Sequence, residues 1–338
     1  MTGKRQWVTE ADHYKCPLSA ETQAIAKEEL REDKRGREQA LKTMREWIQN
    51  NARIANCRLD ARFLLRFLRS KKFSVPQAQE ALERYLLLRQ TYGQAFRNLD
   101  ITLPTMDYLA TNGYLFACPE RDRLGRRVVV ARPGVFDPYK FTNEDMCRYH
   151  GIAYETLMED EENQIRGYNH FNDGQGVGFH YLTLFTPKEA VRIVKNGERT
   201  LPMRHKEVHV INVPPGLKFA LDFGMSLISD KIKQRVKIYT SLEKAKEALG
   251  EDCKVLPKEY GGTMPMEEMI ALWKKELMAS RALLLSHDEM GVREELFSPQ
   301  AREGAVSALR ANTTSCALGM GNSDMLGISG SFRKLEVD

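Results

Sequence analysis

The spacing of apolar residues changes near residue 113, and this change limits the folds that the chain can adopt. Before it, three segments have the three-to-four-residue spacing of amphipathic helices: 19–50, 60–73 and 76–92. After it, short apolar runs alternate with helical segments, which is typical of a sheet layered with helices. The sequence therefore predicts a three-helix module followed by an α/β domain.

The expected strands are short runs rich in β-branched and aromatic residues. They cover 114–118, 127–132, 168–173, 208–213 and 236–240. The expected helices of the second part cover 142–158, 186–195, 217–229 and 266–285. The helix at 186 starts with the capping-box sequence TPKE. The first segment is expected to be interrupted near Gly36. The acidic run 159–162 is interpreted as solvated surface.

These patterns divide the chain into four parts. We expect a flexible N-terminus at 1–18, a helical domain at 19–95, an α/β domain at 96–285 and a C-terminal extension at 286–338. The extension is rich in small and polar residues without periodicity and is predicted to be largely a disordered tail. Its last residues, 329–338, are interpreted either as a solvated terminus or as a docking peptide for a protein partner.

The sequence predicts a cytoplasmic protein. No apolar run approaches the roughly 18 residues that a membrane span needs. The first 15 residues contain no apolar segment of the secretory type. The six cysteines lie far apart without a CxxC pair, as expected of reduced thiols.

Catalytic and cofactor signatures are missing from the chain. It contains no HExxH, GxSxG or GxxxxGK[ST] motif. Gly174, Gly176 and Gly178 have the spacing GxGxG, and an apolar stretch follows them instead of a helix start. His205 and His209 lie near or within an expected strand, where a spacing of four does not bring two ligands together. The sequence predicts no enzyme, no catalytic residue, no metal site and no cofactor.

Basic residues are concentrated in two regions. Net charge is +5 overall, but residues 1–92 carry +7 and the remainder −2. Residues 199–237 hold eight Lys or Arg against three acids, and Lys231 and Arg235 would share a face of one helical turn. Such regions bind nucleic acid or anionic membranes. No recognition helix, zinc finger or aromatic-interleaved basic strand supports nucleic acid.

The segment 217–228 is apolar nearly all round. Its polar residues, Lys218, Asp222 and Ser226, form a single stripe, and Pro214-Pro215 breaks the chain before it. Two interpretations fit such a helix. It is either an ordinary core helix or a cover over an apolar cavity that faces a membrane when it opens, with Gly216 and Gly224 as hinges.

Several motifs occur in the order found in one protein family. They are FLLRFLRSKKF at 63–73, GY at 113–114, GRRVVV at 125–130, EENQIRG at 161–167, VHVIN at 208–212 and LPKEYGG at 256–262. Over 19–285 the chain resembles the CRAL-TRIO lipid-transfer family, in the branch of tocopherol-transfer, retinaldehyde-binding and clavesin proteins. The resemblance implies a mixed sheet as the floor of a hydrophobic cavity, closed by a mobile gate helix at 212–235. It also implies a phosphoinositide-binding cluster of Lys71, Arg204, Lys206, Lys231 and Arg235.

We therefore expect an intracellular carrier of one tocopherol-, retinoid- or fatty-acid-like lipid, which exchanges its cargo at endosomal or other anionic membranes. The candidate cavity and gate residues are chosen by apolarity and position, and core packing explains each equally well. They are Phe171, Leu184, Ile193, Leu201, Val208, Val210, Leu217, Leu221, Met225 and Ile228. The alternative is a phosphoinositide-binding adaptor of endosomes or the trans-Golgi without a transported cargo.

Overall fold

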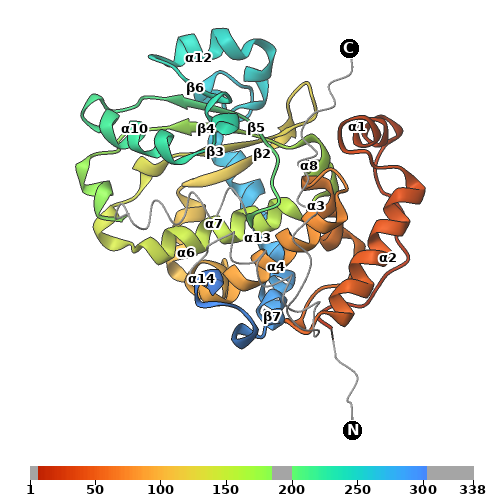
Figure 1. Cartoon of the computed structure of the whole chain (residues 1–338). Coiled ribbons are helices and arrows are strands. Elements are labelled where there is room, and N and C mark those ends of the chain that lie inside the picture. The colour runs from red at the N-terminus through yellow and green to blue at the C-terminus, as the bar shows by residue number, and fades with distance from the viewer. Residues whose placement is uncertain (1–6, 185–199, 303–338) are drawn as a thin grey trace.

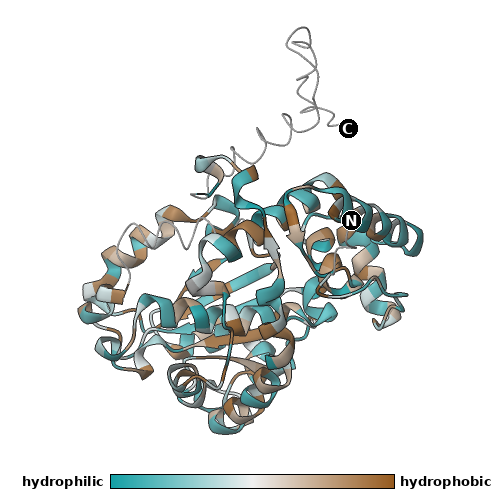
Figure 2. Ribbon diagram, turned by 90° about the horizontal axis from the view of Figure 1, so that it is seen from below, coloured by the Kyte–Doolittle hydropathy of each residue, from teal (hydrophilic) through white to brown (hydrophobic). Residues whose placement is uncertain are grey.

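The change of spacing near residue 113 separates two kinds of structure in the computed structural model, which describes residues 7–184 and 200–302 (Figure 1). The part before it is helical. Its helices are α1 (Ala20–Leu30), α2 (Lys34–Asn50), α3 (Ala61–Ser70), α4 (Val75–Thr91), α5 (Gly93–Phe96) and α6 (Pro104–Thr111). In Figure 2 the outer helices of this part are mostly hydrophilic, whereas apolar residues gather where the elements pack together.

The first helical segment breaks earlier than expected. Arg31 adopts a left-handed conformation (φ 65°) and ends α1. Asp33 then caps α2, because its carboxylate accepts a hydrogen bond from the Gly36 amide at 2.7 Å. The predicted interruption near Gly36 is therefore present, but it lies a few residues earlier, at 31–33. This glycine lies in the first turn of α2, and the polar residues before it make the break.

A five-stranded mixed sheet forms the second part. Its strands are β2 (Leu115–Arg121), β3 (Arg127–Ala131), β4 (Tyr168–Asp173), β5 (His205–Ile211) and β6 (Val236–Ile238), hydrogen-bonded in that order. The first pair is antiparallel and the other three are parallel. This confirms the predicted fold class. β4 has the predicted bounds, whereas β5 starts three residues early and stops before Asn212, which has a positive φ of 53°.

Helices cover both faces of this sheet. One side of the sheet, which we call the α7 face, is covered by α7 (Asn143–Met158), α8 (Glu161–Arg166) and α13 (Met266–Ser286). α12 (Leu242–Leu249) and the turns at 250–260 cover the opposite side, the α12 face. Pairing places His170 and Val208 side by side on the α7 face, and Phe171 and His209 on the α12 face. The predicted capping box of α7 is present at Thr142 and Asp145, whereas the one predicted at 186–189 lies outside the described residues.

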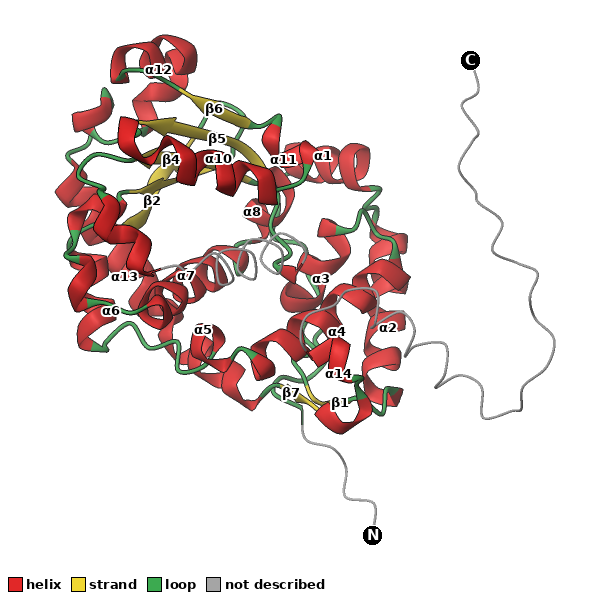
Figure 3. Cartoon of the chain, turned by 60° about the vertical axis from the view of Figure 1, so that its left-hand side comes forward, coloured by secondary structure: helices red, strands yellow, loops and turns green. Residues whose placement is uncertain are grey.

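α10 (Lys218–Leu227) and the short α11 (Asp230–Lys233) connect β5 to β6. Neighbouring parallel strands are joined by right-handed crossovers, which puts the helices of successive connections on one face. Figure 3 agrees, because α10 crosses the sheet near β4 and β5 on the side that looks toward α7. None of the described helices is both long enough and apolar enough to cross a bilayer.

Buried ion pairs fasten the helical module to the α/β part. Arg66 of α3 pairs with Glu155 of α7 at 2.9 Å, and Arg69 pairs with Glu161 of α8 at 2.9 Å. Arg58 holds Glu159. The interpretation of the run at 159–162 as solvated surface is therefore wrong for Glu159 and Glu161. Buried arginines need anionic partners, and these carboxylates supply them.

The C-terminal extension begins as packed structure. β7 (Gly291–Val292) pairs with β1 (Ile54–Asn56), and α14 (Pro299–Arg302) follows. Phe297 and Ala301 join the core of the helical module. The predicted tail thus has an anchored first part, and residues 303–338 lie outside the described residues. The boundaries between the four parts remain a prediction.

Candidate functional site

α10 is an apolar helix that the described part of the chain does not bury. None of its ten residues is buried. Lys218, Asp222 and Ser226 form the exposed polar stripe that the sequence indicates. Because a core helix of this composition would have most of its side chains inaccessible, the core interpretation of this segment is wrong.

The two sides of α10 have different surroundings. Leu217 is buried just before the helix, and Leu221 and Met225 follow it at helical spacing, half-buried. Phe219 and Phe223 are 57% and 41% exposed. Phe179, itself 63% exposed, stacks on Phe219 with a centroid distance of 6.2 Å. The outer side therefore carries an aromatic patch, defined here as Phe179, Phe219 and Phe223.

The proposed cavity residues do not all share one face of the sheet. Val208 and Val210 lie half-buried on the α7 face, the face that α10 crosses. Phe171 lies on the α12 face, where its ring packs on Tyr260 at 5.0 Å. Period-two alternation explains the difference, since Phe171 pairs with His209 rather than with a valine.

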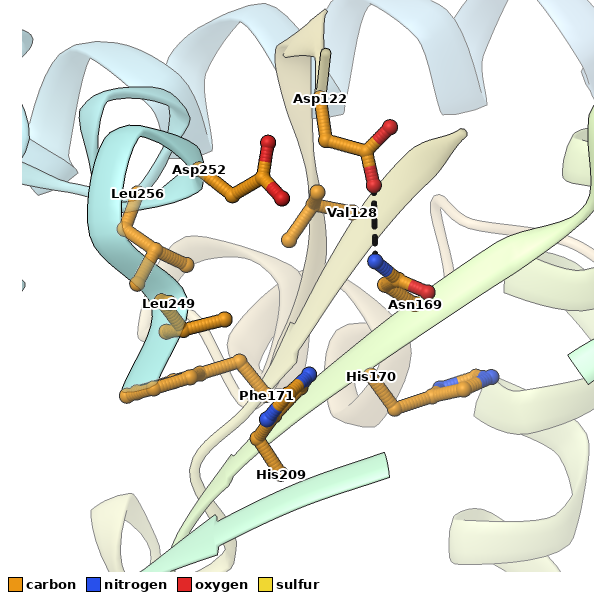
Figure 4. A pocket seen from close by; sticks show the side chains of 9 residues that line it. All are labelled: Asp122, Val128, Asn169, His170, Phe171, His209, Leu249, Asp252 and Leu256. Carbon is orange, nitrogen blue, oxygen red and sulfur yellow. Dashed lines mark hydrogen bonds between the residues drawn. The ribbon is translucent and has the colours of Figure 1, made fainter. Parts of the chain in front are cut away.

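A small pocket on the α12 face shows the environment of Phe171 (Figure 4). The pocket also involves Leu249, Asp252 and Leu256, and the His170 side chain points away from it. Its free volume of about 10 Å³ is room for one water molecule. Lipid-sized ligands need pockets of several hundred Å³. The structure therefore separates Phe171 from the half-buried valines of the α7 face.

The remaining proposed cavity residues are dispersed. Leu184 is buried, and its carbonyl accepts a hydrogen bond from the Asn143 amide group at 2.9 Å. Leu201 is half-buried against a cluster formed by Leu88 and Phe96. Ile228 is half-buried just after α10. Ile193 lies outside the described residues.

The proposed phosphoinositide residues form two adjoining groups. Burial lowers the pKa of Lys71, and nearby Lys231 contributes to this shift. Burial likewise lowers the pKa of Lys206, with Arg204 and Arg235 beside it. Mutual repulsion of this kind marks a cluster of cations that an anion would stabilise.

Backbone contacts fix the two arginines of this cluster. The Arg204 guanidinium donates to the Ile165 carbonyl, and the Arg235 guanidinium donates to the His205 carbonyl. α11 ends at Lys233, so Lys231 and Arg235 do not share a helical turn as expected. Instead, Arg235 leads directly into β6, and its contact with the His205 carbonyl brings it beside β5.

An acidic residue that the sequence did not single out sits in the cluster. Glu29 of α1 accepts hydrogen bonds from Arg204 at 2.6 Å and from Lys206 at 3.0 Å. Burial alone would raise the pKa of Glu29, but these two cations outweigh it and lower the pKa. Glu29 precedes its partners by about 175 residues, and one of three acids on α1 gives no sequence signal for this contact.

Metal ligands do not cluster in the part of the chain that the structure covers. Among residues 7–184 and 200–302, no three His, Cys, Asp or Glu side chains come together as a metal site. Cys57 and Cys118 are fully buried, and burial raises the pKa of each thiol to about 12. Neither thiol has the exposure or the thiolate character of a ligand or nucleophile.

Comparison with known proteins gives two family matches and several curated relatives. The CRAL/TRIO domain matches residues 111–262, and a Pinta-like UBA domain matches residues 33–106. Alpha-tocopherol transfer protein-like of Homo sapiens is 31% identical over 268 residues, covering 79% of this chain and 77% of that protein. Clavesin-1 of Xenopus laevis is 27% identical over 267 residues, covering 79% and 80% respectively. The crystal structure of Sfh5 aligns with a TM-score of 0.47 at 11% identity, over 73% of this chain and 99% of that one.

Proposed function

Because the chain belongs to the CRAL-TRIO lipid-binding family, we propose that it carries one small hydrophobic lipid and exchanges it at membranes that contain phosphoinositides. The family and its branch are those that the sequence motifs resemble. Curated relatives named for tocopherol transfer support a lipid-binding role. The observation that carries the proposal is the unburied apolar helix α10.

The apolar residues of α10 fit a helix that covers a bound lipid with one side and contacts a membrane with the other. Its less exposed side includes Leu221 and Met225, and its outer side carries the aromatic patch. Aromatic side chains favour the membrane interface, and burying apolar surface contributes about 25 cal/mol per Å². A carrier of this kind needs no catalytic residue, since the cargo is released unchanged.

The basic cluster supports docking to anionic lipid. Lys71 directly follows α3, and Lys206 lies in β5 with Arg204 just before it. Lys231 lies in α11, and Arg235 lies in the connection from α11 to β6. Each basic residue near an anionic surface contributes about 1 kcal/mol. We propose that the protein acts in the cytoplasm and attaches peripherally to endosomal or other anionic membranes. The tail beyond residue 302 is the proposed site for a protein partner.

Vesicle flotation with and without phosphatidylinositol bisphosphate tests the docking surface. Lys231→Ala/Arg235→Ala should bind these vesicles about 30-fold more weakly, because two contacts of about 1 kcal/mol are lost. A matched control is Lys42→Ala/Lys254→Ala, which removes the same charge from exposed sites elsewhere. Equal loss in both double variants would leave only a general charge effect and would refute the assigned cluster.

Glu29→Gln tests the same surface in the opposite direction. The substitution frees Arg204 and Lys206 from their internal anion, so binding to phosphoinositide vesicles should rise severalfold.

A lipid-loading experiment distinguishes the proposed carrier from the alternative, an adaptor without a transported cargo. Normal vesicle binding by a chain that can be loaded with no lipid would favour the adaptor.

A further inference from the structure

The helix α1 lies between two points at which the chain is fixed to the rest of the protein. Before α1, the Tyr14 hydroxyl donates a hydrogen bond to Glu161 of α8. After α1, Glu32 is buried and pairs with Arg69 at 2.9 Å. Arg31, which separates α1 from Glu32, has the left-handed conformation that ends the helix. The helix between these points therefore forms a strap, which can shift while the chain on either side of it stays attached.

Polar contacts hold the start of α1 against α8, beside which it lies (Figures 1 and 3). The Thr22 hydroxyl donates to Glu162 at 2.6 Å and accepts from Arg166 at 2.8 Å, and Arg166 also pairs with Glu21 at 3.0 Å. The apolar contact of α1 is a small cluster, distinct from the two larger cores. It consists of Leu18, Ala26, Leu30 and Ile165. Because so few apolar side chains are buried here, α1 depends on its charged contacts.

At the other end of α1, one carboxylate oxygen of Glu29 binds two cations of the basic cluster. Glu29 Oε2 accepts hydrogen bonds both from Arg204 and from Lys206. The Glu29 side chain is 43% exposed, against 16% for Arg204 and 25% for Lys206. Glu29 therefore shields these two cations from an anion that approaches from the solvent.

Glu29 does not stabilise the helix end on which it lies. It belongs to the last turn of α1, next to carbonyl groups that lack partners within the helix, and negative charge there destabilises a helix. Arg204 and Lys206 compensate this repulsion. If another anion binds the two cations, Glu29 loses its partners and the last turn of α1 loses its support.

We infer that α1 is an autoinhibitory strap: the phosphate groups of the docking lipid replace Glu29 on Arg204 and Lys206, and α1 loosens as they bind. A phosphate group presents more oxygens and more negative charge than one carboxylate, and arginine binds it through two parallel hydrogen bonds. The inference rests on the proposed docking surface and adds its regulation. Because coupling between two equilibria is reciprocal, a change that loosens α1 must strengthen docking.

Hydrogen exchange of the full chain tests whether docking loosens α1. The chain is incubated with phosphatidylcholine vesicles that contain or lack phosphatidylinositol bisphosphate. We expect the α1 amides to exchange about fivefold faster when this lipid is present, while the α2 amides stay unchanged. Coverage of α1 by the membrane would have the opposite effect and slow its exchange. Unchanged or slower exchange of α1 would overturn the inference.

Thr22→Val loosens α1 at the end remote from the basic cluster and leaves the charge of the protein unchanged. Thr22 lies seven residues before Glu29, which is about 10 Å along a helix. The variant should bind phosphoinositide vesicles about fivefold more tightly than the wild type. The matched control is Thr43→Val on the exposed side of α2, where the hydroxyl donates to the Gln39 carbonyl at 3.0 Å. This control should bind as the wild type does.

Glu29→Gln distinguishes a strap from a local charge effect. In this variant the α1 amides should exchange fast without phosphoinositide, and the lipid should add little. Tighter vesicle binding by Glu29→Gln but not by Thr22→Val would make Glu29 a local charge only, which overturns the strap and leaves the docking surface standing. Failure of the wild type to bind phosphoinositide vesicles would overturn the docking surface itself, and the strap with it.

Discussion

Two helices of ten residues, α3 and α10, place apolar side chains in opposite environments. In α3, eight residues are buried, including Phe63, Phe67 and two arginines. In α10, which has the more apolar sequence, none is buried. Folding normally removes the most apolar helix from water, since each buried side chain contributes about 1.5–3 kcal/mol. The comparison shows that the apolar surface of α10 is available for something other than the chain's own core.

The largest expected difference between the two helices concerns stability. Phe67→Ala should lower the free energy of unfolding by about 3–5 kcal/mol, because it leaves a cavity in the core of the helical module. Phe223→Ala, on the exposed side of α10, should lower it by less than about 0.5 kcal/mol. Urea unfolding of both variants measures the contrast. A similar loss in the two variants would mean that α10 is a structural helix after all.

The helix ends offer a second, smaller contrast. Asp60 caps α3 by accepting from the Phe63 amide at 3.1 Å, whereas α10 begins at Lys218 and the preceding Leu217 provides no side-chain cap. Asp60→Ala should cost about 1–2 kcal/mol, since it also releases Arg58. Hydrogen exchange gives the companion measurement, with slow amides in α3 and fast ones in α10. Equal protection of the two helices would remove the distinction.

Much of the framework that positions these helices could be predicted from the sequence. The bounds of β4 and the capping box at Thr142 follow from local spacing, which needs only neighbouring residues. The face occupied by Phe171 could not be predicted, because it depends on the register with His209, 38 residues later. The same holds for the contact of Glu29 with Arg204, which tertiary packing alone creates.

The smallest expected effect concerns the sheet beneath α10. Partial burial alone would raise the pKa of Glu207, but hydrogen bonds from Lys237 and Arg126 outweigh it and lower the pKa to about 2. Its contribution to stability is therefore complete above about pH 4.5 and is lost as the pH falls toward 2. Because the pair is partly exposed, we expect at most about 1 kcal/mol.

Glu207→Gln checks this sign. The variant should lose stability at neutral pH and show a flatter decline between pH 4.5 and 2 than the wild type does. Thermal unfolding across this range gives the comparison. An unchanged acid slope in the variant would show that Glu207 keeps its ordinary pKa and that this ion pair does not support the sheet.

Native mass spectrometry of the purified full chain tests most directly whether the apolar helix α10 covers a carried lipid. The proposed function predicts a complex of one chain with one lipid, formed either during expression or after incubation with lipid vesicles. The bound mass should disappear on delipidation and return on reloading. A chain that stays bare under both conditions would contradict the claim that α10 closes over a cargo.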